Sequence, residues 1–196
     1  MRKVVLNKII NSYIEESKKA LDTFLEIDKV SILNASKLIV KAFKSGNKVL
    51  MCGNGGSASD AQHFAAELIG RFKRNRSSFA AISLNTDTSA LTAIANDYDF
   101  TNVFSRQVEG IGKKGDILLA ISTSGNSKNI IKAAIQAKKQ KLNIISLTGF
   151  NTSVLEKNSD LCIKVPSKVT SHIQELHIIV VHLLCTLIEK QFFAKR

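Results

Sequence analysis

The chain has 196 residues, enough for one domain that buries on the order of 70% of its unfolded surface, so folding needs neither a disulfide nor a metal. Lys and Arg outnumber Asp and Glu by 28 to 16, a formal net charge of +12. The basic residues are scattered, and no helix-turn-helix or RNA-binding motif accompanies them. We therefore expect no specific nucleic-acid partner and a basic surface that attracts anionic metabolites.

The cysteines and the apolar stretches indicate the compartment. Cys52, Cys162 and Cys185 lie in apolar surroundings without the spacing of a zinc site, so we expect buried, reduced thiols. The chain starts without a charged-then-apolar leader, and its apolar stretches are shorter than the roughly 20 residues needed to cross a bilayer. We expect a cytoplasmic protein with no membrane partner.

The first 45 residues predict two helices, because apolar side chains such as Ile9, Tyr13 and Leu21 recur at steps of three and four residues. From residue 48 on, strands and helices alternate. The predicted strands are 48–52, 79–84, 117–121, 142–147 and 160–165. The predicted helices are 58–70, 87–96, 100–110, 127–140, 152–157 and 172–192.

Short-looped alternation of this kind predicts βαβ units. The expected fold class is α/β: a three-layer αβα sandwich with a central five-stranded parallel sheet, preceded by the two helices. Residues 1–196 are taken as a single domain.

Two polar turns follow strands of this sheet. Asn54, Gly55, Gly56 and Ser57 come after the first strand, and residues 122–127, Ser-Thr-Ser-Gly-Asn-Ser, come after the third. In parallel sheets ligands bind beyond the carboxyl ends of the strands. Small residues that open a helix there leave backbone N–H groups free, and hydroxyls add donors. The two turns predict a phosphate site; the alternative is a pair of tight turns with helix caps.

Candidate chemical groups lie on two predicted helices. His63 and Glu67 are four residues apart, so they share a face and can share a metal or a proton, although such a pair is more often a surface contact. The last helix is apolar almost all round, which marks a core or interface helix, yet Gln174, His177 and His182 interrupt it. Each must be satisfied by a neighbour or have a function.

Helix geometry limits how Gln174 and His182 combine. They are separated by about 12 Å of rise and about 80° of rotation on a regular helix, whereas each zinc ligand atom lies about 2 Å from the ion. A shared metal requires that both side chains reach toward each other, that Gln174 sits at a loosened helix end, or that different subunits contribute.

Taken together, several motifs resemble the sugar isomerase (SIS) family and, within it, the bacterial phosphoheptose isomerases. The resemblance runs over nearly the whole chain, including the two leading helices. Its motifs are the segment from Asn54 to Phe72, residues 95–98 (Ala-Asn-Asp-Tyr), residues 122–127, and residues 173–177 (Ile-Gln-Glu-Leu-His) with His182.

The resemblance implies a flavodoxin-like SIS fold whose first 45 residues pack in the oligomer, and a homotetramer with active sites near subunit interfaces. It implies one Zn²⁺ per subunit, held by His63, Glu67, Gln174 and His182. Glu67 and His182 form the acid/base pair. The implied substrate contacts are Asn54, Gly55, Gly56, Ser57, Glu67, Asn96, Asp97, Ser122, Thr123, Ser124, Ser127 and Gln174.

One position departs from the family pattern. The family usually has an Arg before the Ile-Gln-Glu stretch, and this chain has Ser171 and His172 there. A neutral His does not replace a guanidinium as an anion clamp. The chain therefore lacks the family's usual cation at this edge of the sugar site.

The activity implied is an aldose–ketose isomerase that converts sedoheptulose 7-phosphate into D-glycero-D-manno-heptose 7-phosphate through an enediol. This is the first step toward the heptose of lipopolysaccharide. The alternative is a non-catalytic relative that binds the replication initiator DnaA; that branch lacks the second histidine of the last helix, present here as His182. A sugar-phosphate-sensing regulator would need a DNA-binding domain, for which the chain has no room.

Overall fold

The computed structural model describes the chain except for residues 1, 28 and 195–196. Its centre is one sheet of five parallel strands in the order β2-β1-β3-β4-β5. The strands are β1 (Val49–Cys52), β2 (Ala81–Ser83), β3 (Ile117–Ser122), β4 (Asn143–Thr148) and β5 (Leu161–Lys164). All five predicted strands are confirmed, with ends shifted by at most a few residues.

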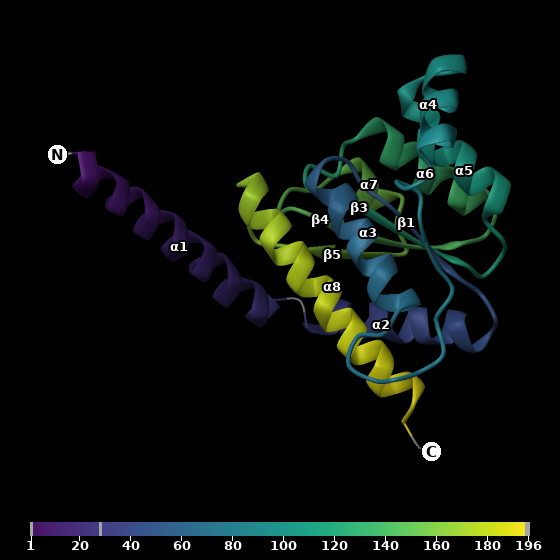
Figure 1. The fold of residues 1–196 in the computed structure, drawn as a ribbon, viewed down its shortest axis with the longest axis horizontal. Coiled ribbons are helices and arrows are strands. Elements are labelled where there is room, and N and C mark those ends of the chain that lie inside the picture. Colours follow the sequence, from purple (N-terminus) through teal and green to yellow (C-terminus); the bar gives the residue numbers. More distant parts are fainter. Residues whose placement is uncertain (1, 28, 195–196) are drawn as a thin grey trace.

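Helices cover both faces of the sheet (Figure 1). One layer holds α2 (Lys29–Lys44), α3 (Gly56–Ile69) and α8 (Thr170–Phe192); the other holds α5 (Val103–Ile111), α6 (Lys128–Lys139) and α7 (Val154–Lys157). The predicted helix at 100–110 begins as a 3₁₀ turn, η1 (Phe100–Asn102), and α4 (Thr88–Asp97), with no buried residue, lies at the rim. The predicted three-layer αβα sandwich is confirmed.

Alternation along the strands builds the two cores. Val49 and Met51 face the core under α2, α3 and α8, whereas Leu50 and Cys52 face the core under α5 and α6. All four residues are fully buried, as expected for a parallel sheet covered on both faces. Of the three free thiols, Cys52 and Cys185 are buried as predicted. Cys162 is partly exposed, because β5 is the edge strand.

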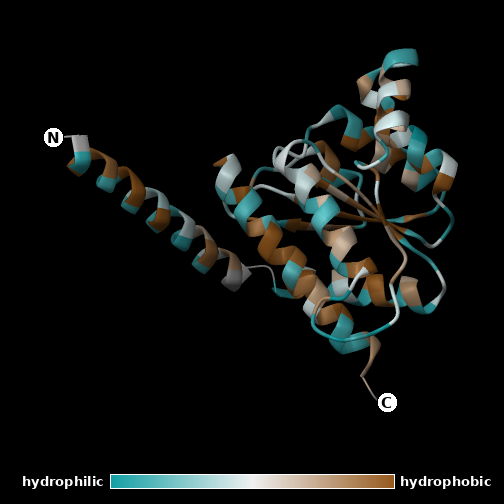
Figure 2. Cartoon of the chain, viewed as in Figure 1, coloured by the Kyte–Doolittle hydropathy of each residue, from teal (hydrophilic) through white to brown (hydrophobic). Residues whose placement is uncertain are grey.

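Helix α1 (Arg2–Ile27) extends away from the sheet (Figure 1). Figure 2 shows apolar residues interspersed along it, and its large apolar side chains are largely exposed. Near its end Ala20 and Phe24 join the core, and polar contacts tie its middle to α8. That residues 1–45 form an extension packed in an oligomer stays a prediction, and residues 1 and 28 lie outside the described part.

The expectation that every apolar stretch is too short to cross a bilayer is wrong for helix α8, which is long and apolar enough to do so. However, half of its most apolar stretch is buried inside the domain. It packs against α2 and α3, with Val180, Leu184 and Ile188 fully buried. The apolar surface of α8 is therefore used within the domain.

The strand order places the functional site. The chain winds from β1 to β2 in one direction and from β3 to β5 in the other, so the order reverses between β1 and β3. Ligands of open α/β sheets bind at such a switch point, outside the carboxyl ends of the strands. The two polar turns follow β1 and β3, the strands on either side of that point.

Candidate active site

The turn after β1 is built by close backbone approach. Gly55 adopts a φ of 56°, in the left-handed region, and opens α3. A Cβ on Gly56 would lie 2.5 Å from Nε2 of Gln174, so a larger residue at this position would displace the Gln174 amide. Asn85, after β2, donates to the Gly53 carbonyl and accepts from its N–H. The turn is thus held from both sides.

The Ser-rich turn after β3 folds on its own hydroxyls. Oγ of Ser122 accepts from the N–H of Gly125 at 3.1 Å and lies 3.1 Å from Oγ of Ser127, while Oγ of Ser124 accepts from the N–H of Asn126. Gly125 has a φ of 64° and packs against Ser153, where no side chain fits. Ser122 is buried and Ser124 exposed. The Ser124 hydroxyl is therefore accessible to a ligand, whereas the Ser122 hydroxyl is held inside the turn by its hydrogen bonds.

A reciprocal amide pair joins the two turns. Nδ2 of Asn54 donates to Oδ1 of Asn129 at 2.9 Å, and Nδ2 of Asn129 donates to Oδ1 of Asn54 at 2.8 Å. Asn129 is buried in the first turn of α6. Sequence reasoning missed Asn85 and Asn129, and a single sequence gives no signal for either, since amides are common in loops and helix starts.

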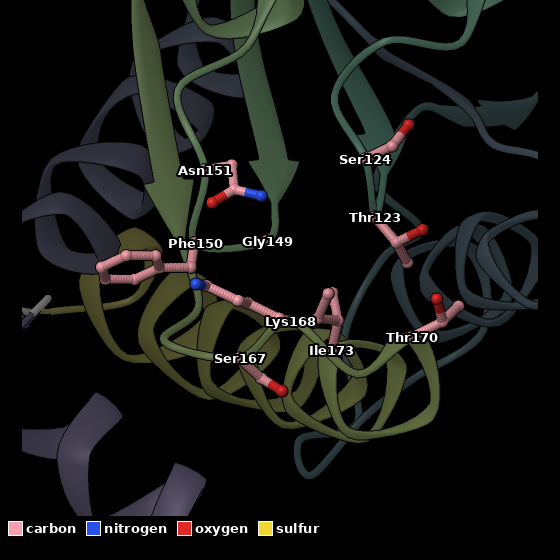
Figure 3. A pocket seen from close by; sticks show the side chains of 9 residues that line it. All are labelled: Thr123, Ser124, Gly149, Phe150, Asn151, Ser167, Lys168, Thr170 and Ile173. Atoms are coloured by element: carbon pink, nitrogen blue, oxygen red, sulfur yellow. The ribbon is translucent and has the colours of Figure 1, made fainter.

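A pocket of about 190 Å³ opens beside the Ser-rich turn (Figure 3). Thr123 and Ser124 form one wall, and the loops after β4 and β5 form the others. Lys168 is the one cationic residue that lines it. Sequence reasoning assigned no site role to the other lining residues, which are Gly149, Phe150, Asn151 and Ser167 from the loops and Thr170 and Ile173 from the start of α8.

Three side chains from α3 and α8 converge at one point between these helices. Nε2 of His63 lies 3.0 Å from Nε2 of His182 and 3.4 Å from Oε1 of Glu67. One ligand atom from each residue can be chosen so that all lie within 4.8 Å of one another. The predicted sharing of one face by His63 and Glu67 is confirmed, and His182 joins them from a helix 119 residues away.

Gln174 occupies a different level of the same two helices. It lies within the regular part of α8 and its amide rests against Gly56, seven residues before His63. Seven residues of helix correspond to about 10 Å of rise. A loosened helix end is therefore not how Gln174 would meet His182, and its place among the metal ligands stays a prediction.

Asn96 and Asp97 lie apart from the other candidates. They end α4, where Nδ2 of Asn96 donates to Oδ1 of Asp97 at 2.8 Å, and both are exposed. Within the part of the chain that the structure describes, neither is hydrogen-bonded to a candidate residue outside this pair. Their predicted contact with substrate is neither supported nor opposed by this arrangement.

Asp60 is a buried carboxylate that sequence reasoning missed. It lies one turn before His63 on α3, it is 9% exposed, and its Oδ2 has no hydrogen-bond partner among the described residues. Burial raises the pKa of Asp60 to about 6, and the nearby His63 opposes that shift. Asp60 is placed to change the charge around His63.

His177 is the core histidine of α8. It is fully buried, and its Nε2 donates to the carbonyl of Thr148 at 3.3 Å. Burial lowers the pKa of His177 to about 4, with the hydrogen bond opposing, so the ring is neutral at neutral pH. His182, by contrast, is partly exposed beside His63. The two histidines of α8 thus have different environments.

His172, at the position that departs from the family pattern, faces α1. Its Nδ1 lies 2.8 Å from Oγ of Ser17 and 3.1 Å from Oε2 of Glu175, and the ring of Tyr13 packs on it. Glu175 also accepts hydrogen bonds from Tyr13 and Ser17. His172 is buried. It therefore joins α1 to α8 and does not act as an anion clamp.

Comparisons with known proteins agree with this geometry. The SIS domain family model matches residues 12–149. Phosphoheptose isomerase of Helicobacter pylori strain 26695 is 48% identical over 191 residues, 97% of this chain and 100% of that protein.

Two solved structures are also similar. Phosphoheptose isomerase from Neisseria gonorrhoeae has a TM-score of 0.90 at 41% identity, covering 94% of this chain and 99% of that one. The Francisella tularensis enzyme has a TM-score of 0.91 at 38% identity, covering 93% and 97%. None of these similarities favours the initiator-binding alternative. The chain belongs to the SIS domain family and, within it, to the phosphoheptose isomerases.

Proposed function

We propose that the chain isomerises sedoheptulose 7-phosphate to D-glycero-D-manno-heptose 7-phosphate, as the entry step to heptose for lipopolysaccharide or related glycoconjugates. The observation that carries the proposal is the meeting of His63, Glu67 and His182 within 4.8 Å of one another, on helices of a sheet whose switch point carries two polar turns. Membership of the phosphoheptose isomerases supports the choice of substrate.

The polar turns are assigned to the phosphate and to nearby hydroxyls. Ser57, Ser122, Ser124 and Ser127 supply hydroxyls, and Asn54, Gly55, Gly56 and Thr123 line the same edge of the sheet. Binding the phosphate far from the reacting carbons supplies binding energy that orients the carbonyl end toward α3 and α8. We assign Gln174, Asn96 and Asp97 to sugar hydroxyls.

Glu67 and His182 are assigned to proton transfer. Moving the carbonyl from C2 to C1 requires a base that removes the proton from C1, an enediol, and return of a proton to C2. Glu67 is the candidate base and His182 the acid that protonates oxygen. They converge on one small volume, so both can reach the adjacent C1 and C2 of one sugar.

The donor set fits a zinc ion. Two imidazoles and a carboxylate are the ligands of many catalytic zinc sites, which leave a fourth position open. Tetrahedral zinc with Zn–N bonds of about 2.0–2.1 Å holds its nitrogens about 3.3 Å apart, and the two Nε2 atoms here are 3.0 Å apart. We propose that His63, Glu67 and His182 hold one Zn²⁺ per subunit, with Gln174 as the further predicted ligand. The ion would supply Lewis acidity toward the sugar oxygens.

A homotetramer in the cytoplasm completes the proposal. Helix α1 exposes Val5, Ile9 and Ile10 by 54–60% each, and a helix with so much exposed apolar surface is typical of an interface. Three free thiols fit a reducing compartment. Light scattering at micromolar concentration should give four copies, and a monomer would contradict this part of the proposal.

The direct test is to incubate the purified, zinc-loaded protein with sedoheptulose 7-phosphate and to follow formation of the aldose. Turnover is expected with the 7-phosphate, and unphosphorylated sedoheptulose should react far more slowly because it lacks the group held by the polar turns. Folded, zinc-loaded protein that forms no aldose would overturn the proposed function.

A further inference from the structure

The segment that follows α3 carries polar groups outside the site described above. Residues 70–80 connect α3 to β2 without forming a helix or strand. A segment of this length needs anchors if it is to hold one conformation. We call residues 70–76 the strap.

A buried ion pair anchors the strap to α8. Nε of Arg76 donates to Oε1 of Glu189 at 2.9 Å, and the two side chains are 2% and 4% exposed. The same carboxylate accepts from the backbone N–H groups of Phe72 at 3.3 Å, Lys73 at 3.1 Å and Arg74 at 3.1 Å. Hydrogen bonds from Arg76 and these backbone groups lower the pKa of Glu189 against the opposing effect of burial, so it stays charged.

The other end of the Arg76 guanidinium closes α3. Its Nη2 donates to the carbonyl of Glu67 and its Nη1 to the carbonyl of Leu68, each at 2.9 Å. The last carbonyls of a helix have no partner within it, so Arg76 donates to the carbonyl of the candidate base Glu67 and to that of the next residue. One side chain therefore joins the end of α3, the strap and α8.

The strap places an aromatic ring on His182. The ring of Phe72 lies 5.7 Å from that of His182, with 20° between the planes. Glu189 is seven residues beyond His182, which is two turns along the same face of α8. Glu189 thus binds the backbone N–H of Phe72, while the ring of Phe72 stacks on His182, two turns earlier on the same helix.

Among the described residues, Nδ1 of His182 has no hydrogen-bond partner. In the described part of the chain, its Nε2 faces His63 and no hydrogen bond reaches Nδ1. Metal-binding histidines usually have a partner on the second ring nitrogen that fixes the ring. Stacking by Phe72 restricts rotation of the imidazole in its place.

We propose that Phe72 is a positioning residue, held by the Arg76–Glu189 pair, that fixes the imidazole of His182 toward His63 and Glu67. This inference rests on the proposed function, since it concerns the same acid and zinc ligand. It assigns a role to three residues outside the proposed metal ligands and acid/base pair.

The test compares variants of the full chain by zinc affinity, measured in competition with a chelator, and by kcat and KM for sedoheptulose 7-phosphate. Phe72→Leu keeps an apolar side chain but removes the ring. It should weaken zinc binding by about 10-fold or more and lower kcat by a similar factor, with KM little changed. Phe72→Tyr keeps the ring and should restore both values.

Phe193→Leu is the matched control. Phe193 contacts the strap through Arg74 and packs on Phe79 and Phe192, with no contact to His182. It should lower thermal stability while leaving zinc affinity and kcat within about twofold. Glu189→Gln should follow Phe72→Leu if it folds; if it does not, the Phe72 variants still decide.

Wild-type zinc affinity and kcat retained in Phe72→Leu would overturn the inference, as would equal damage in Phe193→Leu. A wild-type protein that binds no zinc and forms no aldose would instead overturn the proposed function, so the two failures are distinguishable.

Discussion

The Ser-rich turn and the His63–Glu67–His182 cluster are held together differently. The turn is organised by hydrogen bonds between near neighbours, such as Gly125 N–H to Ser122 Oγ, and by bonds from residues that follow β4, such as Leu155 N–H to the Gly125 carbonyl. The cluster joins side chains from α3 and α8, 119 residues apart, and its own contacts are two histidine nitrogens and a carboxylate.

The difference separates two tasks. A turn whose conformation is already fixed by hydrogen bonds is preorganised for an anion before any ligand arrives. Nitrogens held 3.0 Å apart across two helices depend on how those helices pack and on the strap that ends one of them. We therefore expect changes in the turn to affect substrate affinity, and changes in the cluster to affect metal content and turnover.

The largest effect is expected from removing both imidazoles of the cluster. The double variant His63→Ala, His182→Ala should lose the bound divalent ion and at least about three orders of magnitude in turnover. Elemental analysis and the isomerase assay measure the two losses. His172→Asn is the control, since His172 faces α1, and it should keep its ion. Full occupancy in the double variant would place the metal elsewhere.

A smaller effect is expected in the turn. Ser124→Ala removes an exposed hydroxyl that can reach a phosphate oxygen, and should weaken binding of sedoheptulose 7-phosphate by about 1–3 kcal/mol without loss of zinc. Calorimetry measures the change, with Ser45→Ala, at the opposite end of β1, as the control. Unchanged affinity in alanine variants of Ser57, Ser122, Ser124 and Ser127 would remove the phosphate assignment.

The link between the two turns should contribute to stability. Asn129→Ala leaves the amide of Asn54 and the N–H of Ile130 without their partner, because both bind the Asn129 side chain. The free energy of unfolding should fall by about 1–3 kcal/mol, as urea denaturation would show. Asn75→Ala, in an exposed loop position, should change it by less than about 0.5 kcal/mol. Equal stabilities would mean that the pair adds nothing.

The smallest expected effect concerns Asp60 and its pH dependence. Its pKa of about 6 in the folded protein lies above the ordinary value of 3.8, so its favourable contribution to stability is present below about pH 4 and is lost as the pH rises through 6. In chelator-treated protein, Asp60→Asn should therefore raise the free energy of unfolding at pH 7.5, by about 1–2 kcal/mol, and change it little at pH 4. Denaturation at both pH values measures this; the opposite trend would contradict the burial argument.

Sequence could predict the fold because its signals are local. Apolar strands such as residues 117–121, bounded by polar turns, define βαβ units, and the rules for parallel sheets then fix the layers. The positions of the two polar turns were predictable for the same reason. The edge position of β5, and with it the exposure of Cys162, follows from strand order, which periodicity does not encode.

The cluster was only partly predictable. Spacing paired His63 with Glu67. Nothing in the local pattern distinguishes the partly exposed His182 from the buried His177 five residues earlier. Only the family resemblance separated the two histidines. Asp60 and Asn129 could not be found, because burial of a single polar residue depends on which helices cover it. The strap was missed for the same reason: Arg76 and Glu189 are 113 residues apart and ordinary in isolation.

The most direct test of the central claim, that the α3–α8 cluster carries the chemistry while the turns carry the binding, is one substitution measured twice. Glu67→Gln keeps the shape and an oxygen for the ion but cannot accept a proton. The zinc-loaded variant should bind sedoheptulose 7-phosphate within a few-fold of the wild type and turn it over about two to four orders of magnitude more slowly. Near-normal turnover in Glu67→Gln would contradict the account.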